Sequence, residues 1–78
     1  MSNTLLAMKN VGIIFDLIVR KEIPKLHAIL RGLVSDGVLS REAYEDIIYD
    51  LAEAIWLEGE ELKKKAKEIE KKIRVNLK

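Results

Sequence analysis

The apolar residues in the second half of the chain recur at the spacing of an α-helix. Between positions 44 and 73 they come mostly every three or four residues, at an average of about 3.6, which places them on one helix face. This stripe consists of Tyr44, Ile48, Leu51, Ile55, Leu62, Ala66, Ile69 and Ile73. Gly59 is its weak point, because glycine costs about 1 kcal/mol relative to alanine inside a helix. The pattern predicts one long C-terminal helix, with a kink or break at Gly59 as the alternative.

The first half of the chain predicts two shorter helices. Ser2, Asn3 and Thr4 can each cap a helix, and residues 4–20 carry apolar side chains at helical spacing. The β-branched residues between positions 11 and 19 would also suit a short buried strand. No second strand exists to pair with it, and a lone strand leaves its backbone groups without hydrogen bonds. A helix over residues 4–20 is therefore favoured.

Pro24 opens the second predicted helix, over residues 24–34, because proline suits the first helical turn. Gly37 can take the left-handed conformation that ends a helix, and Ser40 can cap the next one. The predicted fold class is all-α: a three-helix chain, made of a helical hairpin and a long C-terminal helix, that forms an oligomeric bundle. Residues 1–78 make a single domain.

The end of the chain, residues 60–78, is rich in charge. Acidic residues precede basic ones by four positions, a spacing that stabilises an exposed helix by a few tenths of a kcal/mol per pair. The pairs are Glu60–Lys64, Glu61–Lys65, Glu68–Lys72 and Glu70–Arg74. This segment is expected to be the solvated, protruding end of the third helix.

A chain of 78 residues without cysteine and with a single histidine, His27, has neither disulfides nor a structural zinc site to stabilise it. Small domains of this size often gain stability from a partner subunit instead. Residues 11–19 are apolar on nearly every side, and three apolar residues follow one another at positions 55–57. The sequence therefore predicts a homo-oligomer, with a dimer as first choice. The expected interface residues are Ile14, Phe15, Ile18, Ile55, Trp56 and Leu57.

The charged residues offer a second functional hypothesis, contact with nucleic acid. The formal net charge is only +1, so the whole chain does not have the excess of a nucleic-acid binder. Four basic residues nevertheless share one side of the predicted third helix and could contact phosphates: Lys63, Lys67, Lys71 and Arg74. Glutamates lie among them and no aromatic residue is there to stack on bases. Binding of another protein is the preferred hypothesis. Trp56 and Tyr49 are candidate anchors for such a partner, although a place in the core or in the homo-oligomer contact is favoured for both.

No residue pattern predicts catalysis, a cofactor or a metal. Glu42, Asp46 and Asp50 recur every four residues, but helical dinuclear metal sites also need Glu-x-x-His pairs. They are interpreted as a solvated acidic face. His27 has no partner in the sequence pattern that would make it a general acid or base. The chain is predicted not to be an enzyme.

The composition of the chain gives an expectation for its cellular location. The apolar run at residues 11–19 is too short for a membrane span and no cleavage site follows it. The absence of cysteine and glutamine and the Glu/Lys-rich exposed segments are typical of thermophile proteins. A cytoplasmic protein is expected.

One stretch of the chain is similar to a known family. Gly12-Ile13-Ile14-Phe15 is followed by Ile23-Pro24 and then by Gly37-Val38-Leu39-Ser40-Arg41-Glu42-Ala43-Tyr44. Residues 12–55 thereby resemble the C-terminal helical part of PIN-domain proteins, the ribonucleases of toxin–antitoxin pairs. That family's metal-binding acidic residues lie on strands before the matched part, so no catalytic residue is carried over. The resemblance implies a binding or structural module; RNA cleavage through Asp46 or Asp50 is the remaining alternative.

Overall fold

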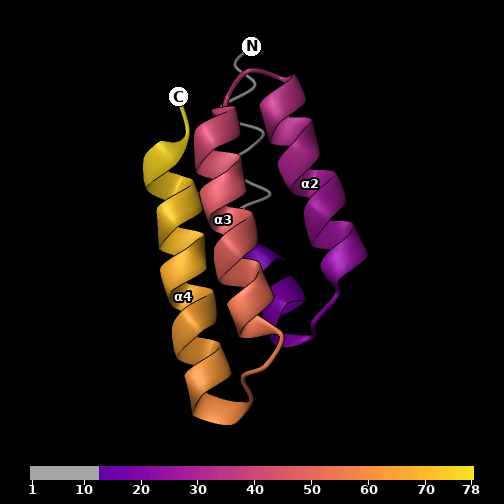
Figure 1. The fold of residues 1–78 in the computed structure, drawn as a ribbon, viewed down its shortest axis with the longest axis vertical. Helices are drawn as coiled ribbons and strands as arrows, with labels where there is room; N and C mark the ends of the chain where they lie inside the picture. Colours follow the sequence, from indigo (N-terminus) through magenta and orange to yellow (C-terminus); the bar gives the residue numbers. More distant parts are fainter. Residues whose placement is uncertain (1–12) are drawn as a thin grey trace.

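The computed structural model describes residues 13–78, and their regular structure is entirely helical (Figure 1). Helical residues 13–19 are followed by α2 (Ile23–Ser35), α3 (Arg41–Ala54) and α4 (Gly59–Asn76). α3 lies beside α2 on one side and beside the antiparallel α4 on the other. The all-α class is confirmed. Residues 4–12 of the first predicted helix lie outside the described residues.

The predicted long C-terminal helix is wrong, because the chain turns back on itself between α3 and α4. The α-helical pattern ends at Ala54, and the Leu57 N–H donates to the Ala54 carbonyl at 3.0 Å in the turn. Gly59 then begins α4 with φ +61, a left-handed conformation that glycine adopts readily. The described residues therefore contain four helical segments, and residues 60–78 lie along α3 instead of protruding. Folding back lets each apolar face cover the other, which a single straight helix cannot do.

The turns around α2 follow the predicted chemistry. Proline lies in the first turn of α2, and Gly37 has φ +77 directly after its end. Ser40 caps α3, since its Oγ accepts a hydrogen bond from the Ala43 N–H at 3.1 Å. These three predictions are confirmed.

The turn before α2 contains a residue with an uncommon backbone conformation. Lys21 has φ +59, although it is not glycine. The Glu22 N–H donates to the Leu17 carbonyl at 2.9 Å, as expected where a left-handed residue ends a helix. The Lys21 Nζ donates to the carbonyl of Ile55 at 3.0 Å. This side chain therefore joins the turn before α2 to the turn between α3 and α4.

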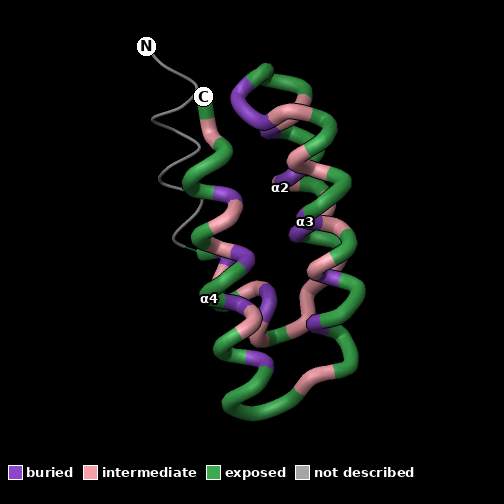
Figure 2. Tube along the Cα trace, turned by 60° about the vertical axis from the view of Figure 1, so that its left-hand side comes forward, coloured by how far each residue is buried: buried purple, intermediate pink, exposed green. Residues whose placement is uncertain are grey.

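The hydrophobic core lies between the helices, and the buried positions run along their facing sides (Figure 2). On α4 the buried residues are those of the predicted stripe, Leu62, Ala66, Ile69 and Ile73. On α3 the buried face is rotated away from the predicted one: it consists of Ile47, Leu51 and Ala54. The predicted Tyr44 and Ile48 are half-buried and Ile55 is 41 % exposed. The rotation follows from the position of α3 between α2 and α4, where the buried face must point toward both.

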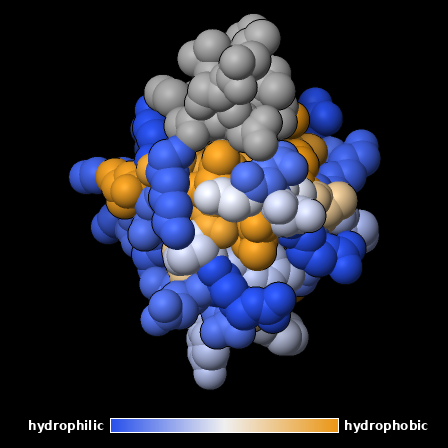
Figure 3. Space-filling model, turned by 90° about the horizontal axis from the view of Figure 1, so that it is seen from above, coloured by the Kyte–Doolittle hydropathy of each residue, from blue (hydrophilic) through white to orange (hydrophobic). Residues whose placement is uncertain are grey.

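The C-terminus returns to the turn between α2 and α3. The Lys78 N–H donates to the Val38 carbonyl at 2.9 Å, and both Val38 and Leu39 are buried. When the bundle is viewed from this end, hydrophobic side chains lie near the centre and hydrophilic ones surround them (Figure 3). The C-terminal residue thus helps to hold the turn that precedes α3.

Candidate interaction surfaces

Two large aromatic side chains are exposed near each other in the sequence, one on α3 and one in the turn that follows it. Tyr49 is 77 % exposed on α3, and Trp56 is 86 % exposed in the turn that begins after the last helical residue, Ala54. We call a set of exposed residues along α3 and this turn the α3 outer face: Glu42, Glu45, Tyr49, Ala52, Glu53 and Trp56. The surface therefore combines two aromatic rings with three carboxylates.

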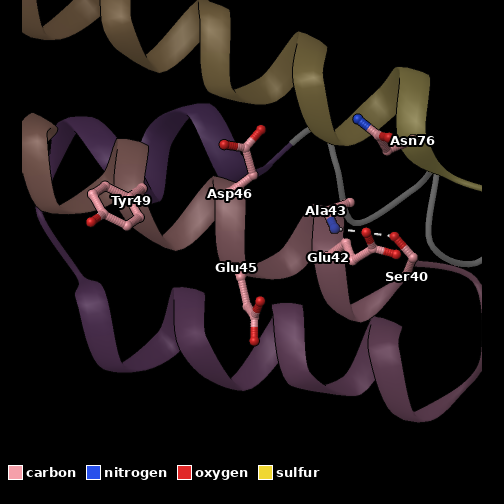
Figure 4. A pocket seen from close by; sticks show the side chains of 7 residues that line it. All are labelled: Ser40, Glu42, Ala43, Glu45, Asp46, Tyr49 and Asn76. Atoms are coloured by element: carbon pink, nitrogen blue, oxygen red, sulfur yellow. Dashed lines mark hydrogen bonds between the residues drawn. The ribbon is translucent and has the colours of Figure 1, made fainter.

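A shallow hollow adjoins this face near the start of α3 (Figure 4). In Figure 4, Asp46 points toward α4, whereas Glu45 points away from it. The residues that line the hollow are Ser40, Glu42, Ala43, Glu45, Asp46, Tyr49 and Asn76. Within residues 13–78 no group of three or more histidine, cysteine, aspartate or glutamate residues is arranged to hold a metal ion. The hollow thus offers acidic and aromatic contacts on an open surface.

Acidic residues of α3 are bound by lysines of α4. The Lys72 Nζ lies 2.6 Å from Asp50 Oδ2 and 3.2 Å from Asp46 Oδ2. The Lys65 Nζ lies 3.6 Å from Asp50 Oδ1 and 3.9 Å from Glu53 Oε2. We call these five residues the α3–α4 ion-pair cluster. Hydrogen bonds to Asp50 and then Asp46 raise the pKa of Lys72, since they favour its charged form.

This cluster revises two expectations from the sequence. The residues Glu42, Asp46 and Asp50 do not form a uniformly solvated face, because the Asp50 side chain is only 18 % exposed and contacts two lysines. Lys65 and Lys72 turn toward α3, away from the glutamates four positions before them. Of the four predicted pairs within α4, Glu70–Arg74 is formed, at 3.5 Å.

The basic residues on the other side of α4 remain at the surface. The exposed set, called the α4 basic stripe, is Lys63, Lys64, Lys67, Lys71 and Arg74. Lys63 lies 3.9 Å from Glu60, and Arg74 pairs with Glu70. No residue of the described part of the chain forms an ion pair with Lys67 or Lys71. The four predicted phosphate contacts are thus brought together on one side of the helix.

A second hollow lies where the helix of residues 13–19 meets the first turns of α4. It has a volume of about 440 Å³ and is lined by Phe15, Glu60, Lys63, Lys64 and Lys67. We call it the Phe15 hollow. Its wall combines one half-buried aromatic ring with three lysines. Sequence analysis missed it, because Phe15 and the lysines are far apart along the chain and no local pattern joins them.

The residues predicted to form an oligomer interface are separated by the fold. Ile14 and Ile18 are buried in the protomer's own core, so they cannot contact another subunit. Phe15 and Leu57 are half-buried and pack against that core. Trp56 is exposed, and Ile55 partly so. Trp56 is therefore the predicted interface residue most open to a partner.

No protein-family model, curated protein or solved structure matches the chain. The resemblance of residues 12–55 to PIN-domain proteins therefore stays a prediction. None of the helices in residues 13–78 has both the length and the apolar character needed to cross a membrane.

Proposed function

We propose that this chain is a non-enzymatic helical interaction module, which self-associates and binds another protein. The observation that carries the proposal is the pair of exposed aromatic residues, Tyr49 on α3 and Trp56 in the turn that follows it. Tyrosine and tryptophan supply much of the binding energy in protein interfaces, because they bury a large apolar area and keep a polar group for hydrogen bonding. An interface that covers α3 and the turn after it would remove both rings from water.

Every buried residue of the described part of the chain is hydrophobic. The polar and charged side chains of residues 13–78 lie at or near the surface, where a protein partner would meet them.

Light scattering on a sizing column tests self-association. The expected mass of the native chain is a multiple of 8.9 kDa. The variant Trp56→Ser should elute with the mass of one chain, whereas the control Val75→Ser, which removes another exposed apolar residue of 69 % exposure on α4, should keep the native mass. A native chain of 8.9 kDa at every concentration, or a Trp56→Ser variant that associates like the native chain, would contradict the proposal.

The second candidate function is contact with nucleic acid through the α4 basic stripe. The observation in its favour is that Lys63, Lys67, Lys71 and Arg74 are all exposed on one side of α4. Binding of this kind weakens steeply with salt, because each neutralised phosphate releases counterions. The affinity for a DNA or RNA duplex should fall as salt rises, and fall further in Lys67→Glu/Lys71→Glu. The control Lys25→Glu alters an exposed lysine on α2 and should change the affinity less.

A further inference from the structure

The turn that carries Trp56 and the Phe15 hollow are complementary in charge, although they belong to the same chain. Trp56 is an exposed indole in the turn after α3, with the exposed carboxylates of Glu53 and Glu58 near it in the chain. Glu53 also lies 3.9 Å from Lys65 of its own chain, but its side chain is 65 % exposed and open to a second contact. The hollow offers the opposite arrangement: the ring of Phe15 with lysines around it. One surface is an aromatic projection with acidic neighbours, and the other is an aromatic recess with a basic rim.

Each part of the hollow suits this projection. An indole can stack on or against the Phe15 ring, and lysine ammonium groups are attracted to the face of tryptophan. Carboxylates beside the indole would form charge-assisted hydrogen bonds with the lysines. Lys64 and Lys67 have no ion-pair partner among residues 13–78, so they are free to make these bonds. Glu60 also lines the hollow, but its carboxylate lies 3.9 Å from Lys63 and offsets that one charge.

The two surfaces are not joined within one protomer. Trp56 is 86 % exposed and does not line the hollow. Both lie at the same end of the bundle, because Trp56 is in the turn between α3 and α4 and the hollow involves the first turns of α4 (Figure 1). Reciprocal exchange of this contact between two copies related by a two-fold axis would close the assembly as a dimer.

We propose that Trp56 of each copy occupies the Phe15 hollow of a second copy, with Glu53 and Glu58 facing Lys64 and Lys67 across the interface. This inference rests on the proposed self-association and gives it a specific surface and partner. The occupant is a second copy of this chain, because that chain itself carries the projection whose charge and ring match the hollow.

Mixing two variants tests the reciprocal contact. Trp56→Ser lacks the projection and keeps the hollow, while Lys64→Glu/Lys67→Glu keeps the projection and reverses the rim of the hollow. Each variant alone loses both contacts of the dimer, so its dissociation constant should rise by about thirtyfold or more. In a mixture one intact projection meets one intact hollow. A 1:1 heterodimer, weaker than the native dimer and weakened further by salt, is therefore expected in sedimentation velocity.

The controls separate this inference from the broader proposal. All substituted residues are exposed, and circular dichroism of each variant should match the native spectrum. If the native chain dimerises but the mixture stays monomeric, this interface is wrong and the proposed self-association stands. If the native chain is monomeric, both fail. If Lys64→Glu/Lys67→Glu dimerises normally and loses only nucleic-acid binding, the basic stripe serves the second candidate function and this inference is overturned.

Discussion

Lys72 of α4 donates a 2.6 Å hydrogen bond to Asp50 of α3, across 22 positions of the sequence. Lys65 approaches the other oxygen of the same carboxylate at 3.6 Å. Asp50 thus joins two lysines of α4 to the helix that precedes it. The α3–α4 ion-pair cluster supports the antiparallel packing on which the outer faces of both helices depend.

Removal of the Lys72 ammonium should destabilise the fold. We expect Lys72→Gln to lower the free energy of unfolding by about 1 kcal/mol, because the pair is partly shielded and its hydrogen bond is charge-assisted. Lys71→Gln is the matched control: it removes the neighbouring exposed lysine, which has no ion-pair partner among the described residues, and should change stability by less than about 0.5 kcal/mol. Urea denaturation measures both. Equal effects would show that the cluster does not stabilise the packing.

The same residue predicts how stability depends on pH. Its neighbouring carboxylates raise the pKa of Lys72 above the ordinary value of 10.5. The folded state therefore holds the Lys72 proton more tightly than the unfolded state. The stability that the charged Lys72 adds is fully present below pH 10.5 and is lost as the pH rises through the folded pKa. The stability difference between the native chain and Lys72→Gln should be constant near neutral pH and narrow in strong alkali. If the difference in the free energy of unfolding stayed constant until Lys72 was fully deprotonated, the predicted pH dependence would be wrong.

Replacement of two glycines by alanine should change the stability of the fold in opposite directions. Gly59 has φ +61, where a side chain is strained, so Gly59→Ala should cost about 1 to 2 kcal/mol. Gly32 lies inside α2, and an added Cβ there meets no atom within 4 Å. Gly32→Ala should therefore stabilise by about 0.5 to 1 kcal/mol. Thermal unfolding of the two variants gives the comparison. A neutral Gly59→Ala would mean that α4 can begin without the left-handed residue.

Ile69 tests the core between the helices. It is fully buried on α4, so Ile69→Ala should cost about 2 to 5 kcal/mol through lost burial and the cavity left behind. A small domain has little stability in reserve, and this variant should be largely unfolded at moderate temperature. Val75→Ala, on an exposed position of the same helix, should change stability little. Equal melting temperatures for the two variants would be incompatible with the described core.

The sequence predicted those parts of the fold that depend on local chemistry. The cap at Ser40, the left-handed Gly37 and the buried stripe of α4 each follow from residues within a few positions of one another. Gly59 was identified as the point where a long helix could break. Whether it breaks depends on how much apolar surface is covered when α4 folds back, and that depends on the whole bundle.

The candidate surfaces were harder to predict. The sequence paired Lys65 and Lys72 with glutamates four positions before them, but both bind carboxylates of α3 instead. Lys63, Lys67 and Lys71, which were predicted to share one side, stay at the surface. Ile14 and Ile18 were expected at an interface because their helix is apolar on many sides. They are buried within the protomer's own core instead. This burial depends on tertiary packing, which the spacing of apolar residues along the chain does not reveal.

The most direct measurement uses the intrinsic fluorescence of Trp56, which is the only tryptophan of the chain. Its spectrum therefore reports on one side chain, 86 % exposed in the single chain. If Trp56 lies in the interface between copies, its emission should move to shorter wavelength and its quenching by acrylamide should weaken as the protein concentration rises. Lys64→Glu/Lys67→Glu should shift this change to higher concentration. Emission typical of a water-exposed indole at every concentration would contradict the proposal that the chain associates through Trp56.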